Sequence, residues 1–166
     1  MLMTAADYRE SLRRRRPRVF INGRQVTSVA DEPLLGPGIA GVGVTYDFAH
    51  IPAHAALMTA RQGAAGPTAN RMLHIDETTT DLLRTLEAVR LVCQESGCAQ
   101  RYLAHDALNA IFEATRLADE ESGGEYHQRF LAYLDQVQAE DLALGIAMTD
   151  AKGDRSKRIS AQANPD

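Results

Sequence analysis

The stretch DLLRTLEAVRLVCQESGCAQRYLAHDALNAIFEATRLAD, residues 81–119, carries apolar side chains at helical spacing on both sides of a glycine. Its first half predicts a helix that Asp76 or Thr78 caps and Gly97 ends. Its second half predicts a helix over residues 98–119. The residues expected to face the core are Leu82, Leu86, Val89 and Cys93 in the first helix, and Leu103, Ala107, Ala110, Ile111 and Ala114 in the second.

A third helix is predicted after the Gly123-Gly124 break, over residues 125–141. Its inward residues are expected to be Phe130, Leu134 and Val137. Three consecutive helices of this kind predict a mainly α fold with a helical core.

The chain before this core contains shorter elements. Thr4 and Asp7 form a start signal for a helix that Pro17 ends. Two short strands around Asn22-Gly23 predict a small β-hairpin near residues 18–29, since both turn positions need a positive φ. The apolar run over residues 39–50 predicts another helix, and residues 61–71, rich in glycine and proline, predict a loop.

Composition restricts the class of protein. The chain has 166 residues, 45% hydrophobic and 24% charged, which suits one globular domain. A net charge of -4 gives no general attraction to nucleic acid. No stretch approaches the ~20 apolar residues of a membrane span, and the N-terminus does not resemble a signal peptide. Cys93 and Cys98 lie too close along one helical stretch for a disulfide, so a cytoplasmic protein is expected.

Four groups of residues are candidate sites. Cys93, Cys98, Tyr102 and His105 either begin a metal site or fill a helix interface. His50 and His54 have the i, i+4 spacing of a helical metal pair or are ordinary residues at a helix end. The basic run over residues 13–16 is a solvated helix end or a phosphate contact. Residues 148–156 concentrate polar groups around Gly153, as in either a ligand-binding loop or a plain polar loop.

Ordered motifs along nearly the whole chain carry a resemblance to a known family. They are DYRESL, PRVFINGRQV, PLLGPGI, YDFAH, HIDETTTDLL, QRYLAHDALNA, YHQRFLAYL and AMTDAKGDRS. In this order they resemble the flavin-dependent family that contains 4-hydroxyphenylacetate 3-monooxygenase and 4-hydroxybutyryl-CoA dehydratase. HDALNA and MTDAKGDRS look closest to the dehydratase branch.

The resemblance implies the helical N-terminal domain of a flavoprotein similar to acyl-CoA dehydrogenases. Residues 1–145 would form that domain, and residues 146–166 would begin the connection to a β-domain. The β-domain and a C-terminal helical bundle are then expected as missing partners, in a fragment, a split subunit or a truncated homologue. The resemblance also implies a homo-oligomer.

The resemblance gives the helix around Cys98 two readings. In the dehydratase the matching helix carries Cys-x-x-x-Cys, and both thiolates bind a [4Fe-4S] cluster. Cys98 matches the first, but Tyr102 occupies the second position, so a cluster is not expected here. In the monooxygenases, an arginine and a residue one turn later contact the phenolic substrate, which implies substrate-binding roles for Arg101, Tyr102 and His105.

Arg101 and His105 are the catalytic residues that this comparison implies. Arg101 would orient an anionic oxygen, and His105 would polarise or deprotonate a phenol. The family's loop matching residues 148–155 contacts FAD. The cofactor-binding residues it implies are Met148, Thr149, Lys152, Gly153, Asp154 and Arg155.

The leading prediction of function is part of a monooxygenase that uses reduced FAD from a separate flavin reductase to hydroxylate an aromatic or related small substrate. The isolated chain is expected to be inactive. Two alternatives are a CoA-ester dehydratase or isomerase and a noncatalytic assembly subunit or remnant.

Overall fold

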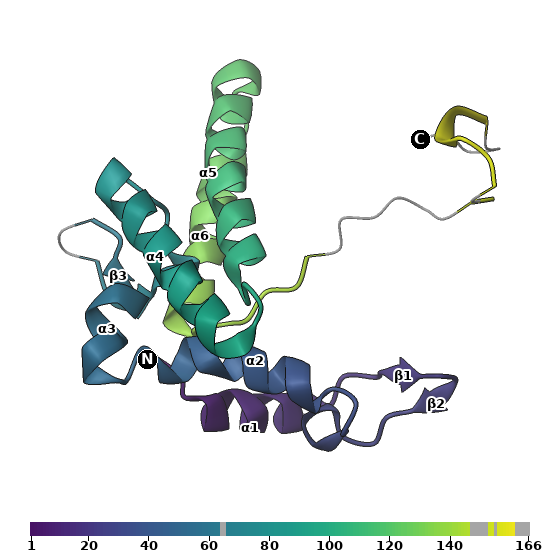
Figure 1. Ribbon diagram of the computed structural model, residues 1–166. Helices are drawn as coiled ribbons and strands as arrows, with labels where there is room; N and C mark the ends of the chain where they lie inside the picture. Colours follow the sequence, from purple (N-terminus) through teal and green to yellow (C-terminus); the bar gives the residue numbers. More distant parts are fainter. Residues whose placement is uncertain (64–65, 147–152, 155, 162–166) are drawn as a thin grey trace.

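The computed structural model describes residues 1–63, 66–146, 153–154, 156–161, and is mainly helical (Figure 1). The α-helices are α1 (Ala5–Arg15), α2 (Gly36–Asp47), α3 (Pro52–Met58), α4 (Thr79–Ser96), α5 (Tyr102–Ser122) and α6 (Tyr126–Ala139). The strands are β1 (Phe20–Ile21), β2 (Arg24–Gln25), β3 (Thr59–Arg61) and β4 (Thr68–Asn70). Short 3₁₀ turns are η1 (Val29–Asp31), η2 (Arg71–Leu73) and η3 (Ile159–Ala161).

The helices form two groups that meet at α2 (Figure 1). The helices α5 and α6 pack along one another, while α4 contacts α2, α3 and η2. On the other side of α2 lies α1. The hairpin of β1 and β2 extends from one end of the α1–α2 layer (Figure 1). This arrangement confirms the predicted helical domain with a small hairpin.

Polar caps fix where two of the helices begin. Thr78, rather than Asp76, caps α4: its hydroxyl accepts from Asp81 N, and the Asp81 carboxylate accepts from Thr78 N. Thr4 and Asp7 form the same reciprocal pair at the start of α1, as predicted. Each pair satisfies amide groups that have no partner within the helix. Hydrogen bonding to the Thr78 hydroxyl also lowers the pKa of Asp81.

Two antiparallel hairpins flank the helices. Asn22 and Gly23 have φ values of 49° and 76°, which confirms the predicted turn between β1 and β2. The pairing of β3 with β4 was not predicted, because residues 61–71 were expected to form only a loop. The Arg71 guanidinium donates to the carbonyls of Leu57 and Thr59, which ties η2 to the entry of β3.

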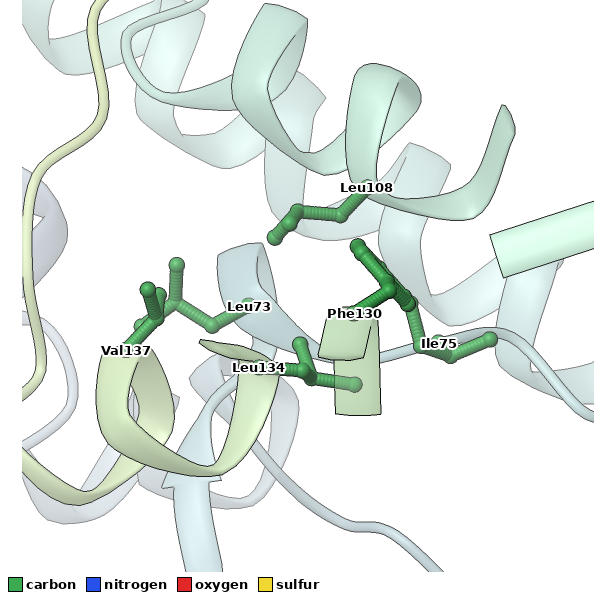
Figure 2. Packing of buried hydrophobic residues seen from close by; sticks show 6 residues of the cluster. All are labelled: Leu73, Ile75, Leu108, Phe130, Leu134 and Val137. Atoms are coloured by element: carbon green, nitrogen blue, oxygen red, sulfur yellow. The ribbon is translucent and has the colours of Figure 1, made fainter. Parts of the chain in front are cut away.

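Two clusters of buried side chains form the core. The first joins η2, α5 and α6 (Figure 2) and contains Leu73, Ile75, Leu108, Phe130, Leu134 and Val137. The second joins α3, η2 and α4 and contains Ala49, Met58, Met72, Ala88 and Val92. The first cluster confirms the inward face predicted for α6.

Most residues predicted to face inward on α4 and α5 are exposed, although Val89 packs partly buried against the second cluster. Leu82 and Leu86 are each 47% exposed, and Leu103 is 57% exposed. The buried residues are instead Thr85, Ala88 and Val92 in α4, and Ala104, His105 and Leu108 in α5. Both helices carry apolar residues on more than one face, so helical periodicity did not identify the face that meets the core.

Across the described residues, no helix has both the length and the apolar character that crossing a bilayer requires.

Candidate functional site

A pocket opens where the segment before α4 meets the first two turns of α5. Its volume is about 380 Å³. Its walls are formed by Asp76, Glu77, Thr78, Thr79, Leu82, Tyr102, His105, Asp106 and Asn109. The pocket therefore combines two predicted site residues, Tyr102 and His105, with carboxylates from both sides.

His105 is held against Asp76 in this pocket. His105 Nε2 lies 3.2 Å from Asp76 Oδ2, and the histidine is only 3% exposed. We assign the proton to Nε2, since a carboxylate is an acceptor and His105 Nδ1 is buried without a partner in the described part of the chain. A histidine and a carboxylate in contact can pass a proton between them, which suits acid–base chemistry.

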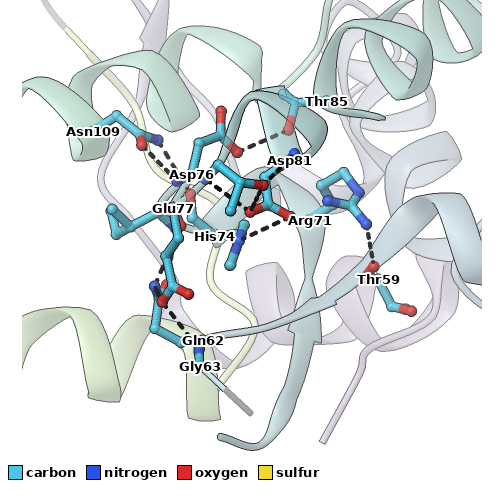
Figure 3. Close-up of polar contacts among 12 residues, drawn as sticks. Thr59, Gln62, Gly63, Arg71, His74, Asp76, Glu77, Asp81, Thr85 and Asn109 are labelled. Carbon is cyan, nitrogen blue, oxygen red and sulfur yellow. Dashed lines mark hydrogen bonds and ion pairs between the residues drawn. The ribbon is translucent and has the colours of Figure 1, made fainter. Parts of the chain in front are cut away.

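The Asp76 carboxylate is oriented from several directions (Figure 3). Its Oδ1 accepts from the Thr85 hydroxyl at 3.2 Å, and its backbone amide donates to Asn109 Oδ1 at 2.8 Å. Asn109 Nδ2 donates to the carbonyl oxygens of His105 and His74, at 2.9 and 3.2 Å. These bonds connect the segment before α4 with α5 and fix Asp76 facing His105.

The sequence pattern marks Asp76 only as a candidate helix cap and does not mark Asn109 as a site residue. The spacing of His105 and Asn109, i and i+4 on a helix, was the available signal, because it places both on one face. Their common partner lies 29 residues from His105. No local pattern predicts a contact of that separation.

Tyr102 forms the outer part of the same wall. Its ring stacks beside that of His105, with 6.2 Å between the centroids and 19° between the planes. The residue is half-buried and lines the pocket.

Arg101 does not line the pocket, although it directly precedes Tyr102. Its guanidinium is buried between α2 and the end of α6, where Nη2 lies 2.9 Å from Asp141 Oδ1. The structure thus brings together two of the three residues predicted to bind substrate and places the third on another side of the helix start.

The predicted metal candidates are dispersed. Cys98 is exposed and Cys93 is half-buried, and both are free thiols. His50 precedes α3 while His54 lies within it, because Pro52 begins the helix. Among the described residues, no three His, Cys, Asp or Glu side chains are grouped to hold a metal ion. These donors do not by themselves match the four ligands of an iron–sulfur cluster.

Most of the predicted flavin loop lies outside the described residues, namely Met148, Thr149, Lys152 and Arg155. Gly153 and Asp154 are described and exposed. Asp154 Oδ1 accepts from the amide and the hydroxyl of Ser156 at 3.0 and 2.6 Å. These bonds lower the pKa of Asp154.

Comparison with known proteins places this fold in a family. Residues 4–166 match the family model described as 4-hydroxyphenylacetate 3-hydroxylase N terminal. The 4-hydroxybutyryl-CoA dehydratase/vinylacetyl-CoA-Delta-isomerase of Clostridium aminobutyricum is 41% identical over 100% of this chain and 34% of its own length. The oxygenase component of 4-hydroxyphenylacetate 3-monooxygenase from Thermus thermophilus is 26% identical over 99% of this chain and 34% of its own.

Solved structures agree with these matches. An oxygen-tolerant archaeal 4-hydroxybutyryl-CoA dehydratase from N. maritimus superposes with a TM-score of 0.89 at 41% identity, covering 100% of this chain and 33% of that one. A 4-hydroxyphenylacetate 3-monooxygenase oxygenase component in complex with FAD and 4-hydroxyphenylacetate gives 0.75 at 25% identity, covering 98% and 33%. The chain spans about a third of the length of these relatives. It belongs to the 4-hydroxyphenylacetate 3-hydroxylase family and corresponds to the N-terminal domain of its members.

Proposed function

We propose that this chain is the helical N-terminal domain of a flavoenzyme of the dehydratase and isomerase type, acting on a CoA ester. The contact between His105 Nε2 and Asp76 Oδ2 in the pocket carries the proposal. The 41% identity to a dehydratase/isomerase, against 26% to a monooxygenase component, supports this reaction class.

The pair suits a proton shift along an acyl chain. Moving a double bond toward a thioester carbonyl removes a proton from the α-carbon and returns one to the γ-carbon, while the electron pair between them shifts. Asp76, whose side chain is 13% exposed, is the member of the pair that a substrate can reach. His105 donates to Asp76 from the protein side, and together they hold and return the proton.

The charge of the pocket favours a substrate whose reacting end is uncharged. Asp76, Glu77 and Asp106 contribute carboxyl groups, and among the residues that the structure describes no lysine or arginine lines the pocket. Like charges at close range repel, so a free carboxylate such as that of 4-hydroxyphenylacetate is disfavoured here. A thioester carbonyl carries no charge and does not meet this penalty.

FAD is the cofactor that we propose for the complete enzyme. It is present in the 25%-identical monooxygenase structure, and residues 148–155 are the segment we propose to contact it. When bound, FAD supplies the redox chemistry, while the residues of this chain orient the substrate and handle protons. We propose no [4Fe-4S] role for the described donors of this chain, since Cys98 is exposed and Tyr102 replaces the second expected thiolate.

A reduced-FAD monooxygenase, supplied by a separate flavin reductase, is the second candidate. It is supported by the TM-score of 0.75 to the oxygenase complex and by the tyrosine at position 102, which leaves a cluster without one expected ligand. In that reaction class, the His105 and Asp76 pair would accept the proton of a phenol.

Two parallel assays distinguish the candidates. The chain is prepared with the domains that its relatives carry beyond the matched third, and vinylacetyl-CoA is incubated with it in deuterated water under anaerobic conditions. We expect deuterium exchange into the thioester and its conversion to the conjugated isomer. Hydroxylation of 4-hydroxyphenylacetate with reduced FAD and oxygen, without exchange into the CoA ester, would instead establish the monooxygenase.

Variants connect the result to the pocket. Asp76→Asn and His105→Gln are each expected to lower the exchange rate by about 100-fold, the usual contribution of a positioned acid or base. Glu87→Gln is the matched control, because it removes an exposed carboxylate of α4 that does not line the pocket. Equal losses in all three variants would contradict a specific role of the pair.

A further inference from the structure

Arg101 is a deeply buried charged side chain whose two terminal nitrogens have partners, whereas its Nε is buried without a hydrogen-bond partner among the described residues. Its side chain is 2% exposed, and Nη2 donates both to Asp141 Oδ1 at 2.9 Å and to the Leu142 carbonyl at 3.1 Å. Nη1 lies 3.4 Å from the Thr45 hydroxyl, and the guanidinium stacks 4.3 Å from the centroid of the Tyr46 ring. Its charge is therefore matched by a buried carboxylate and its face by an aromatic ring.

Asp141 joins four separate parts of the chain. Besides Arg101, its Oδ2 accepts from the amide of Met3 at 3.0 Å, and its carbonyl accepts from the Tyr46 hydroxyl at 2.9 Å. The residue is fully buried two positions after the end of α6, with a φ of 48°. The N-terminal segment, α2, the start of α5 and the end of α6 are thus held at one point.

The backbone of Arg101 determines how α5 begins. Its φ of 64° lies in the left-handed region, which is unfavourable for a residue with a side chain and persists only when the surroundings hold it. Its carbonyl accepts from the amide of His105 at 3.1 Å, which is a first-turn hydrogen bond of α5. The backbone conformation of Arg101 therefore determines the direction in which the side chains of Tyr102 and His105 project from α5.

We propose that Arg101 is a positioning residue, which through its buried ion pair with Asp141 aims Tyr102 and His105 into the pocket and does not contact the substrate. The inference rests on the proposed function in taking this pocket as the reacting site. It assigns Asp141 a role in the site as well, although Asp141 lies outside the pocket wall. Removing either partner alone leaves a buried charge unmatched.

A neutral double variant separates positioning from substrate binding. Arg101→Met with Asp141→Asn removes both charges, and asparagine tolerates the left-handed backbone at position 141 and still accepts from Met3. Arg101→Lys keeps the charge and the ion pair but has no second nitrogen for the Thr45 hydroxyl. Arg116→Met is the matched control, because Arg116 forms exposed ion pairs at the far end of the same helix.

The first readout uses this chain and is independent of the reaction. Thermal unfolding reports the fold, and side-chain NMR signals report the surroundings of the Tyr102 and His105 rings. We expect both ring signals to shift in Arg101→Lys and to stay unchanged in Arg116→Met. Unchanged ring signals in Arg101→Lys would overturn the proposal, whatever the enzyme proves to catalyse.

The second readout is the kinetics of the assembled enzyme. A positioning role predicts that Arg101→Lys lowers kcat by about tenfold and changes KM by less than about twofold, since misaligned groups slow the chemical step. The double variant is expected to keep KM within the same limits. A rise of KM above about tenfold in a folded variant with unshifted ring signals would show instead that Arg101 binds the substrate. If the double variant does not fold, Arg101→Lys decides between the two roles.

Discussion

Asn109 Oδ1 accepts from the backbone amide of Asp76 at 2.8 Å, which holds the residue that contacts His105 against the middle of α5. The same side chain donates to the carbonyl of His74. One asparagine therefore determines how the segment before α4 lies along α5, and with it the geometry of the pocket.

Asn109→Ala is expected to lower the free energy of unfolding by about 1–3 kcal/mol, because it leaves the amide of Asp76 and the carbonyl of His74 without their partner. Chemical denaturation of the variant measures the change. Asp106→Ala, an exposed neighbour on the same helix, is the control and is expected to change stability by less than about 0.5 kcal/mol. Equal stabilities of the two variants would contradict this role of Asn109.

Leu108 and Leu103 test which face of α5 meets the core. Leu108 is 2% exposed and lies in the first core cluster, whereas Leu103 is 57% exposed. Leu108→Ala is expected to cost about 3 kcal/mol through lost burial and a cavity, and Leu103→Ala less than about 0.5 kcal/mol. Urea denaturation of both variants checks the difference. A larger loss of stability in Leu103→Ala than in Leu108→Ala would mean that α5 is rotated about its axis.

Thr78→Ala is expected to destabilise the protein by about 1 kcal/mol, because the first amides of α4 lose the hydroxyl that caps them. It should also raise the pKa of Asp81 toward its ordinary value, since the hydrogen bond from that hydroxyl is the main cause of the lowering. NMR titration of Asp81 measures the second effect. Thr80→Ala, inside the same helix, should produce neither change.

His74 makes stability depend on pH. Burial lowers its pKa below the ordinary value of 6.5, so the folded protein keeps it neutral while the unfolded chain takes up a proton near that value. Below pH 6.5 the unfolded state therefore binds more protons than the folded state. The contribution of neutral His74 to stability is complete above pH 6.5 and is lost as the pH falls toward its pKa in the folded protein. Denaturant midpoints across this range measure the slope. The slope should decrease in His74→Gln, and an unchanged slope would assign it to other groups.

The sequence allowed the helical class, the hairpin at Asn22-Gly23 and the cap at Thr78 to be predicted, since each depends on residues that are neighbours in the chain. The side of α4 and α5 that is buried could not be predicted. Leu82 and Thr85 are equally compatible with a helix, and only tertiary packing determines that Thr85 is buried and Leu82 is exposed. The strands β3 and β4 are three residues each and are too short to give an alternating pattern.

In the candidate site, too, some residues could be predicted from local sequence and others depend on tertiary contacts. Tyr102 and His105 were recognised because they lie one turn apart on a helix, and the resemblance to a family drew attention to them. Asp76 contacts His105 of α5 from 29 positions away along the chain, and Asp141 contacts Arg101, the residue before α5, from 40 positions away. Such partners depend on the complete fold. The division of the chain near residue 145 and the flavin contacts of residues 148–155 stay predictions.

The outward leucines of α4 and α5 also affect the calorimetry of this chain. The heat-capacity increment of unfolding arises mainly from apolar surface that becomes hydrated when the chain opens. Leu82, Leu83, Leu86 and Leu103 are already between 47% and 61% exposed in the folded state, so they add less to that increment than fully buried leucines would. The stability curve of this chain is therefore expected to be flatter against temperature than that of a protein of equal length whose leucines are buried.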